Sequence, residues 1–288
     1  MLAPELLKKV QNIFIHSRHR VNDVFAGEYE SAFRGRGIEF EEFREYTPGD
    51  DVRQIDWNVT ARMDRPFVKV FREEREQTIF FMVDVSKSLL FGQNKDKIEV
   101  ATEIAALLAY AAIKSNDKVG LILFSDQIEK YIPPKKGRGH VWNIIATVLT
   151  HKPIGRKTDL ASVVNFFLKV AHRKTTAFMI SDSFAENYTD AMRVASMKHD
   201  MIAIRIVDEL EKNFPKGALM DFEDLESGQV LHLDMAKNHK TVMKNYSQMT
   251  KSLTGLCGSS KTDYLELRVN DDYVDQLMKF FMLREKRR

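Results

Sequence analysis

Oxygen-bearing side chains that could hold a metal ion directly follow an apolar run near residue 80. The run covers residues 79–83, and Asp84, Ser86 and Ser88 come next on alternate positions. One carboxylate and two hydroxyls with this spacing can turn toward one point and offer hard oxygen ligands, which Mg²⁺ prefers. The spacing therefore predicts part of a cation site. It is also typical of a turn whose serines cap the next helix.

Two later loops have the same polar character. Thr158 lies in the loop 155–160 before a predicted helix, and Asp182 follows the apolar run 176–180. The carboxyl ends of parallel strands meet at one edge of a sheet, so we expect these loops to lie beside the first one. The predicted ligands are then Asp84, Ser86, Ser88, Thr158 and Asp182.

The apolar runs must form buried strands for these loops to meet. Residues 79–83 lack the polar alternation of a half-exposed strand, which favours a central strand of a sheet covered on both faces. Further strands are predicted over 118–124, 128–132, 176–180 and 201–207, and helices over 95–114, 141–149, 160–171 and 188–198. This alternation predicts an α/β fold with a doubly wound, mainly parallel sheet.

Additional elements are predicted at both ends of the chain. An N-terminal helix is expected over 4–24, and short strands within 52–59 and over 67–71. Past residue 208 we expect a hairpin formed by 218–222 and 229–233, helices over 236–253 and 272–285, and a frayed, solvated end at 284–288. The predicted domains are 1–75, the helix with a small β-rich extension, and 76–288, the α/β domain with the hairpin and C-terminal helices.

Composition and charge restrict the classes of function. The chain has 288 residues, a net charge of +3 and a single cysteine, Cys257. This net charge gives no argument for nucleic-acid binding, and one cysteine excludes an intramolecular disulfide framework. The start has no signal-peptide hydrophobic region, and the longest apolar stretch, 101–113, is too short to cross a bilayer. We therefore expect a cytoplasmic protein without a membrane span.

Arginine and acidic residues alternate densely between residues 34 and 72. A nucleic-acid surface would be mostly basic, so the mixture favours a self-paired network of charges. We expect structural ion pairing in this segment.

The predicted oxygen set resembles the metal-ion-dependent adhesion site (MIDAS) of von Willebrand factor A domains. The shared pattern is Asp-x-Ser-x-Ser, a later Thr and a later Asp after another apolar strand. The resemblance implies that Ser86, Ser88 and Thr158 contact the cation, while Asp84 and Asp182 act directly or through water. The cation would be Mg²⁺, or Mn²⁺ or Ca²⁺, and a further position would take a carboxylate from a partner.

The upstream segment resembles the signature of a narrower bacterial family. The residues are Arg44-Glu45-Tyr46-Thr47-Pro48-Gly49-Asp50-Asp51-Val52-Arg53-Gln54-Ile55-Asp56-Trp57, followed by Thr60-Ala61-Arg62. They are similar to the DUF58 proteins, von Willebrand A-like proteins associated with MoxR-type AAA+ ATPases. The resemblance runs from about residue 15 to 283. It implies a non-enzymatic adaptor that acts with such an ATPase in protein maturation or complex assembly.

Two alternatives stay open at this point. Lys87, Arg156 and Lys157 lie close in sequence to the predicted ligands and oppose a bound cation, so the hydroxyls and carboxylates could bond to each other instead. The enzyme alternative is a Mg²⁺-dependent phosphohydrolase with Asp84 as its nucleophile, although Ser86 stands where such enzymes need a second carboxylate. The chain has no P-loop, no dinucleotide-binding glycine motif and no H-E-x-x-H motif.

Overall fold

The protein forms two compact units in a computed structural model. The structure describes residues 4–21, 23–33, 38–63, 65–73, 76–90, 96–182, 188–212, 219–223, 225 and 228–287. The large unit contains Met1–Phe33 and Thr78–Arg288, and the small unit contains Arg34–Gln77.

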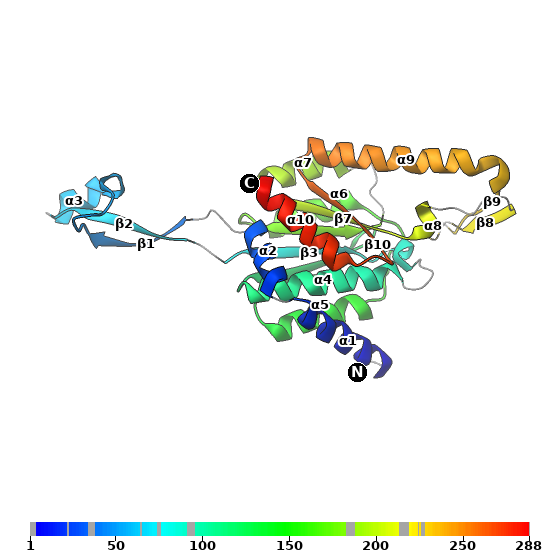
Figure 1. The fold of residues 1–288 in the computed structure, drawn as a ribbon, viewed down its shortest axis with the longest axis horizontal. Coiled ribbons are helices and arrows are strands. Elements are labelled where there is room, and N and C mark those ends of the chain that lie inside the picture. The colour runs from blue at the N-terminus through cyan, green and yellow to red at the C-terminus, as the bar shows by residue number, and fades with distance from the viewer. Residues whose placement is uncertain are drawn as a thin grey trace. The chain divides into compact units, whose positions relative to one another are not determined.

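A six-stranded sheet runs through the large unit (Figure 1). Its strands are β3 (Thr78–Asp84), β4 (Lys118–Phe124), β5 (Ile128–Lys135), β6 (Thr176–Ser181), β7 (Asp200–Val207) and β10 (Asp263–Arg268). Their order is β10-β7-β6-β3-β4-β5, and only β5 is antiparallel to its neighbour. The run predicted at 79–83 is therefore a central strand, as expected.

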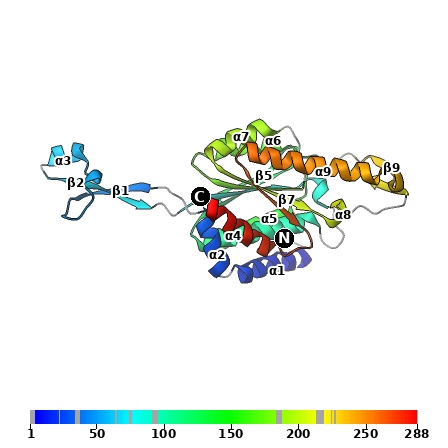
Figure 2. The same ribbon diagram turned by 45° about the horizontal axis from the view of Figure 1, so that its top comes forward.

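Helices cover both faces of this sheet (Figures 1 and 2). One layer holds α1 (Pro4–Arg20), α2 (Asp23–Phe33), α4 (Lys97–Lys114), α5 (Arg138–Thr150) and α10 (Tyr273–Arg287). The other holds α6 (Leu160–Val170), α7 (Thr189–Lys198) and α9 (Met235–Ser259). Successive side chains of a strand point to opposite faces, so Phe81 joins the first core cluster and Phe80 the second. The predicted α/β fold is confirmed.

A short excursion lies between β7 and α9. It consists of α8 (Glu209–Lys212) and the hairpin of β8 (Leu219–Glu223) and β9 (Val230–Asp234). The excursion lies at the end of the sheet where the carboxyl end of β3 also lies (Figures 1 and 2). The hairpin was predicted within one residue of these bounds.

The small unit contains helices where strands were predicted. Its elements are β1 (Ile38–Glu45), the 3-10 helix η1 (Val52–Gln54), α3 (Trp57–Met63) and β2 (Phe67–Glu73). Short strands had been expected within 52–59. The carboxylate of Asp56 accepts hydrogen bonds from Asn58 N at 2.9 Å and Val59 N at 3.1 Å. This capping favours a helix over the strand indicated by the apolar residues.

Arg44 forms one of the ion pairs predicted in the small unit, and Lys69, which was not part of the prediction, forms another. Arg44 Nη2 donates to Asp50 Oδ1 at 2.9 Å, and Lys69 Nζ lies 2.8 Å from Asp56 Oδ2. The hydrogen bond from Arg44 is the main reason that the pKa of Asp50 falls to about 2. These pairs hold the turn after β1 and the start of α3.

Three further expectations differ from the structure. Helices α1 and α2 belong to the large unit, so the small unit begins at Arg34 and the N-terminal helix is not grouped with it. The edge strand β10 was not predicted. The end of the chain is not wholly solvated, because Arg284 is buried and pairs with Asp200 and Asp263.

Candidate metal centre

The five predicted ligands lie together at the carboxyl ends of β3 and β6. Ser86 N donates to Asp84 Oδ1 at 2.8 Å, and Ser86 Oγ lies 2.9 Å from Ser88 Oγ. Ser88 Oγ donates to Asp182 Oδ1 at 2.9 Å. Thr158 Oγ1 is 3.4 Å from Asp84 Oδ2, which is a weak contact. One hydrogen-bonded cluster, which we call the oxygen cluster, thus joins all five residues.

The pairing of β3 with β6 brings these residues to the same level at the carboxyl ends of the strands. Val83 is level with Ile180, so Asp84 ends β3 just where Ser181 ends β6. Ser88 lies in the 3-10 helix η2 (Lys87–Leu90). Thr158 precedes α6, whose first turn is capped by Asp159, which accepts from Ser162 N at 3.0 Å. Ser183, which follows Asp182 in the third loop, lies outside the described residues.

Asp84 is fully buried and surrounded by uncharged donors. Besides Ser86 N, Ser181 Oγ donates to its Oδ2 at 2.6 Å. Burial is the main cause that raises the pKa of this carboxyl to about 7. Among the described residues, no ion pair reaches Asp84. The site therefore contains a carboxylate whose negative charge lacks a cation.

A buried lysine that sequence reasoning did not single out contacts the other carboxylate. Lys97 Nζ, at the start of α4, donates to Asp182 Oδ2 at 2.8 Å and also pairs with Glu211 of α8. Burial favours the neutral amine, but the two carboxylates outweigh it and raise the pKa of Lys97. A lysine in the first turn of a predicted helix is typical of a surface position, so no sequence signal pointed to it.

The cations that sequence reasoning did point to are less buried. Lys87 is half-buried, and Arg156 and Lys157 are exposed. Arg205 of β7 is fully buried instead, and its Nε donates to the backbone oxygen of Asp182 at 3.3 Å. Arg205 thereby fixes the backbone that carries Asp182.

A second buried carboxylate holds the loop that carries Thr158. Glu129 of β5 accepts hydrogen bonds from Gly155 N at 2.8 Å, Ile154 N at 3.0 Å and Ser125 Oγ at 2.7 Å. Its other oxygen lies 3.2 Å from Nε2 of His151. The contacts between Glu129 and this loop were not predicted, because Glu129 lies in a short strand that is far from Thr158 in sequence.

The residues present fit a hard cation by the chemistry of their donors. The oxygen cluster offers two carboxylates and three hydroxyls, and Asp84 lacks a positive partner in the described residues. Lys97 neutralises one oxygen of Asp182 and would compete with a cation there. No group of three His, Cys, Asp or Glu side chains suited to a metal occurs in the described part of the chain.

Comparison with known proteins gives one family and several uncharacterized relatives. A sequence model of the family described as "Protein of unknown function DUF58" matches residues 42–253. An uncharacterized protein of Mycobacterium tuberculosis is 26% identical over 292 aligned residues, which cover 98% of this chain and 91% of that protein. An uncharacterized protein of Mycobacterium bovis matches to the same extent.

Solved structures resemble the chain only distantly. An aerotolerance-related membrane protein from Bacteroides fragilis has a TM-score of 0.47 and 14% identity, covering 74% of this chain and 100% of that one. The conserved hypothetical protein BatB from Bacteroides thetaiotaomicron has a TM-score of 0.45 and 13% identity with the same coverage. At these scores the likeness carries no argument about activity.

The prediction of a cytoplasmic location is not upheld; the protein of Bacteroides fragilis above is described as a membrane protein. The prediction rested on the single cysteine and on a start that shows no signal-peptide hydrophobic region. Neither feature excludes attachment at a membrane surface, so that inference does not hold. In the described residues, no helix combines the length and apolar character needed to cross a bilayer.

Proposed function

Because the chain belongs to the DUF58 family, whose function is unknown, we propose a function from its oxygen cluster. The protein acts as a non-enzymatic interaction module that docks a partner carboxylate with the help of a divalent cation. Asp84, Ser86, Ser88, Thr158 and Asp182 hold the cation, Mg²⁺ by preference and Mn²⁺ or Ca²⁺ as substitutes.

The observation that carries the proposal is the buried carboxylate of Asp84, which forms no ion pair with a described side chain. A buried carboxylate is costly to ionise, and its pKa of about 7 reflects that cost. Hydroxyls of Ser86 and Ser88 lie beside it on the same loop and supply neutral oxygen ligands. A cation bound there supplies the positive charge that a partner carboxylate recognises.

The residues around the cluster orient it without taking part in docking. Glu129 holds the loop that precedes Thr158, and Arg205 holds the backbone at Asp182. Lys97 places a positive charge beside the carboxylate of Asp182 and fixes its direction. Such support keeps the ligands in place before a cation arrives, which lowers the entropic cost of binding.

The partner that we propose is a MoxR-type AAA+ ATPase, a client protein of that ATPase, or both. The choice rests on the sequence resemblance of segment 44–62 to DUF58 proteins, which implies an association with such ATPases. In this role the chain serves protein maturation or complex assembly as an adaptor.

A phosphohydrolase centred on Asp84 receives less support. A nucleophile must reach its substrate, whereas Asp84 is 0% exposed and hydrogen-bonded to Ser181 and Ser86. The position two residues later is Ser86, which cannot act as the general acid. We therefore place the non-enzymatic function first.

Calorimetric titration of the whole chain with Mg²⁺ and with Mn²⁺ tests the cation. We expect saturable binding that Ser86→Ala and Ser88→Ala each weaken at least about tenfold, since each removes one ligand. Ser252→Ala, which removes an exposed hydroxyl from α9, is the matched control and is expected to bind as the natural chain does. Absence of binding by the folded natural chain would overturn the proposal.

Co-purification tests the partner. The tagged chain is used to capture its MoxR-type ATPase with Mg²⁺ and again with chelator. We expect capture only with Mg²⁺, and loss of capture in folded Ser86→Ala. Equal capture with chelator would contradict the dependence on a cation while leaving the partner itself supported.

A further inference from the structure

The edge strand β10 offers a docking edge on the opposite margin of the sheet from β5. It is hydrogen-bonded to β7 on one side, and no described strand lies on its other side. Residues 263–266 are half-buried, and Arg268 is exposed. Exposed strand edges carry backbone donors and acceptors that can pair with another chain, and several peptide-binding domains use this mode.

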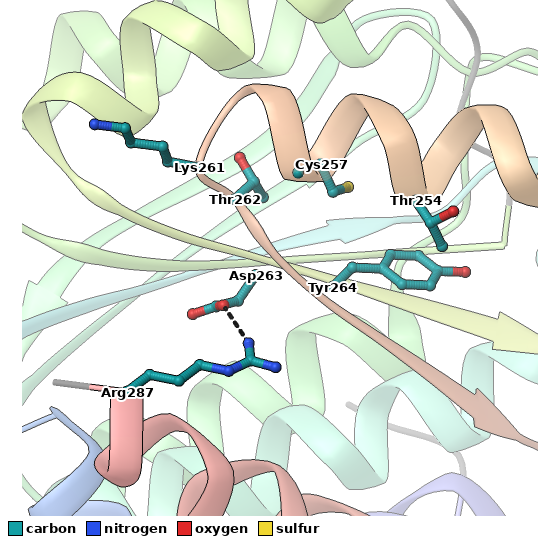
Figure 3. Close-up of a pocket in the computed structure, with 8 residues that line it drawn as sticks. Thr254, Cys257, Lys261, Thr262, Asp263, Tyr264 and Arg287 are labelled. Atoms are coloured by element: carbon teal, nitrogen blue, oxygen red, sulfur yellow. Dashed lines mark ion pairs between the residues drawn. The ribbon is translucent and has the colours of Figure 1, made fainter.

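Two adjoining pockets flank this edge, and we call them together the β10 groove. The first, of about 450 Å³, lies between the C-terminal end of α9 and the start of β10, where Thr254 and Cys257 face the strand (Figure 3). The second, of about 320 Å³, lies between β10 and α10. Tyr264 and Arg287 line both pockets, so the groove follows the strand edge from one helix layer to the other.

Apolar side chains lie at the centre of the groove, and basic side chains lie on its rim. Leu283 of α10 is 56% exposed, and Leu265 and Phe280 beside it are half-buried. Lys261, Lys279 and Arg287 are exposed on the rim. The acidic residue among the lining side chains is Asp263, which is already paired with Arg284 and lies 3.8 Å from Arg287. The groove therefore presents positive charge around an apolar centre.

We propose that the β10 groove accepts an extended, acidic segment of a partner protein, which adds to the sheet as a strand beside β10. Its backbone pairs with the strand edge, an apolar side chain covers Leu283, and its carboxylates meet Lys279 and Arg287. Charge complementarity selects this occupant, because a basic rim attracts acidic segments and repels a second copy of itself. This surface lies along the edge strand β10, whereas the oxygen cluster lies at the carboxyl ends of the inner strands β3 and β6, so the inference does not depend on the cation.

The groove is suited to binding and not to covalent chemistry. Cys257 is the nucleophilic residue type in its lining, and burial raises the pKa of its thiol to about 11. A thiol with so high a pKa is almost entirely protonated at neutral pH and reacts slowly. The lone cysteine thus serves as part of the apolar wall under α9.

Fluorescence anisotropy of the whole chain with short labelled peptides tests the proposal. The probe alternates valine and glutamate. One comparison peptide replaces glutamate by lysine, and another replaces alternate valines by proline, which removes backbone donors. We expect binding of the acidic peptide alone, weakened by salt, together with slower hydrogen exchange at the amides of 263–268.

Charge reversal locates the binding site. Lys279→Glu with Arg287→Glu is expected to weaken binding of the acidic peptide at least about tenfold. Lys240→Glu with Lys244→Glu, exposed on α9 at least two turns before Thr254, is the matched control and should bind normally. If the double reversal disturbs the circular dichroism spectrum, Lys279→Glu alone gives the same comparison. Equal binding of the proline peptide, insensitivity to the reversal, or a dimer that pairs through β10 would overturn the proposal.

Discussion

At the residue scale, Asp84 makes the stability of the protein depend on pH when no cation is bound. Its pKa rises from the ordinary 3.8 to about 7 because the carboxyl is buried, so the folded state holds a proton that the unfolded state has released between these values. Stability therefore falls as pH rises from about 4 to about 7. At about 1.4 kcal/mol for each pKa unit, the upper limit of this loss is about 4 kcal/mol.

Asp84→Asn is expected to remove this loss. In chelator at pH 8, the variant should exceed the natural chain in free energy of unfolding, and the difference should shrink toward pH 4. With Mg²⁺ the order should reverse, because only the carboxylate binds the cation well. Urea unfolding across this pH range measures both effects. Asp190→Asn, which removes a highly exposed carboxylate, is the control; an Asp84→Asn difference that does not vary with pH would refute the argument.

Lys97 supplies a positive charge to Asp182 that a metal ion could replace in part. Lys97→Met leaves Asp182 and Glu211 without their buried partner, so we expect a loss of about 3–5 kcal/mol in unfolding free energy in chelator. Added Mg²⁺ should stabilise this variant more than the natural chain, since Asp182 is then free to bind it. Differential scanning calorimetry with and without Mg²⁺ measures the comparison.

Lys114→Met is the matched control for Lys97. Lys114 pairs with Asp23 at 2.6 Å, but the two side chains are 44% and 98% exposed. Solvent screens such a pair, so the loss should be much smaller than that of Lys97→Met and should not respond to Mg²⁺. If Mg²⁺ stabilised Lys97→Met no more than the natural chain, Lys97 and the cation would not compete for Asp182.

At the element scale, the loop 151–159 depends on Glu129. Burial alone would raise the pKa of Glu129, but hydrogen bonds from Gly155 N, Ser125, His151 and Ile154 N outweigh it and lower the pKa below 4.5. The stabilisation from this carboxylate is therefore present above pH 4.5 and is lost as pH falls through the lowered pKa.

Glu129→Gln replaces one accepting oxygen by an NH₂ group that cannot accept. We expect a loss of about 2 kcal/mol at neutral pH and faster amide exchange at 154–159, while the amides of β3 keep their protection. Hydrogen exchange read by mass spectrometry distinguishes the two regions. Glu285→Gln, exposed on α10, is the control. Equal acceleration in β3 would mean that Glu129 supports the whole domain and not the loop.

The elements that were predicted well from the sequence are those whose pattern reports burial directly. Residues 79–83 and 176–180 are uninterrupted apolar runs, and both are central strands. β10 was not predicted because an edge strand with Asp263, Glu266 and Arg268 among its six residues lacks such a run. The segment 52–63 was misassigned because side-chain caps at Asp51 and Asp56 outweighed its apolar spacing.

The ligands of the candidate site could be predicted from the sequence, but the residues that surround and support them could not. Asp84, Thr158 and Asp182 follow strands or precede a helix, so topology alone brings their loops together. Lys97 and Glu129, which contact the site, lie on a helix and a strand whose sequence patterns do not place them near it. Only the tertiary structure shows that their side chains are buried. Arg284 is the same case, since a basic residue near a C-terminus is expected to be solvated although it packs over Phe33.

At the scale of the whole molecule, the core belongs to the large unit alone. Of the two hydrophobic clusters of the described residues, the first contains residues from 13–33 and from 79 onward, and the second contains residues from 80 onward. Neither contains a residue of 34–77. The ring of Phe33 packs on that of Phe178 at 5.5 Å, and Ile79 pairs with Thr176 at the start of β6. The two ends that flank the small unit are thus held by the same strand.

Replacing residues 34–77 by a short glycine-serine linker should therefore leave the large unit folded. We expect cooperative thermal unfolding within a few degrees of the natural chain and unchanged Mg²⁺ titration, because no core contact is removed. Phe33→Ala in the full chain is the contrasting variant and should cost about 3–5 kcal/mol, since Phe33 is 2% exposed and its ring contacts Phe281 as well. Non-cooperative unfolding or aggregation of the shortened chain would show that the small unit contributes to the stability of the large one. The packing of α2 would then not be enough to place the boundary of the large unit at Phe33.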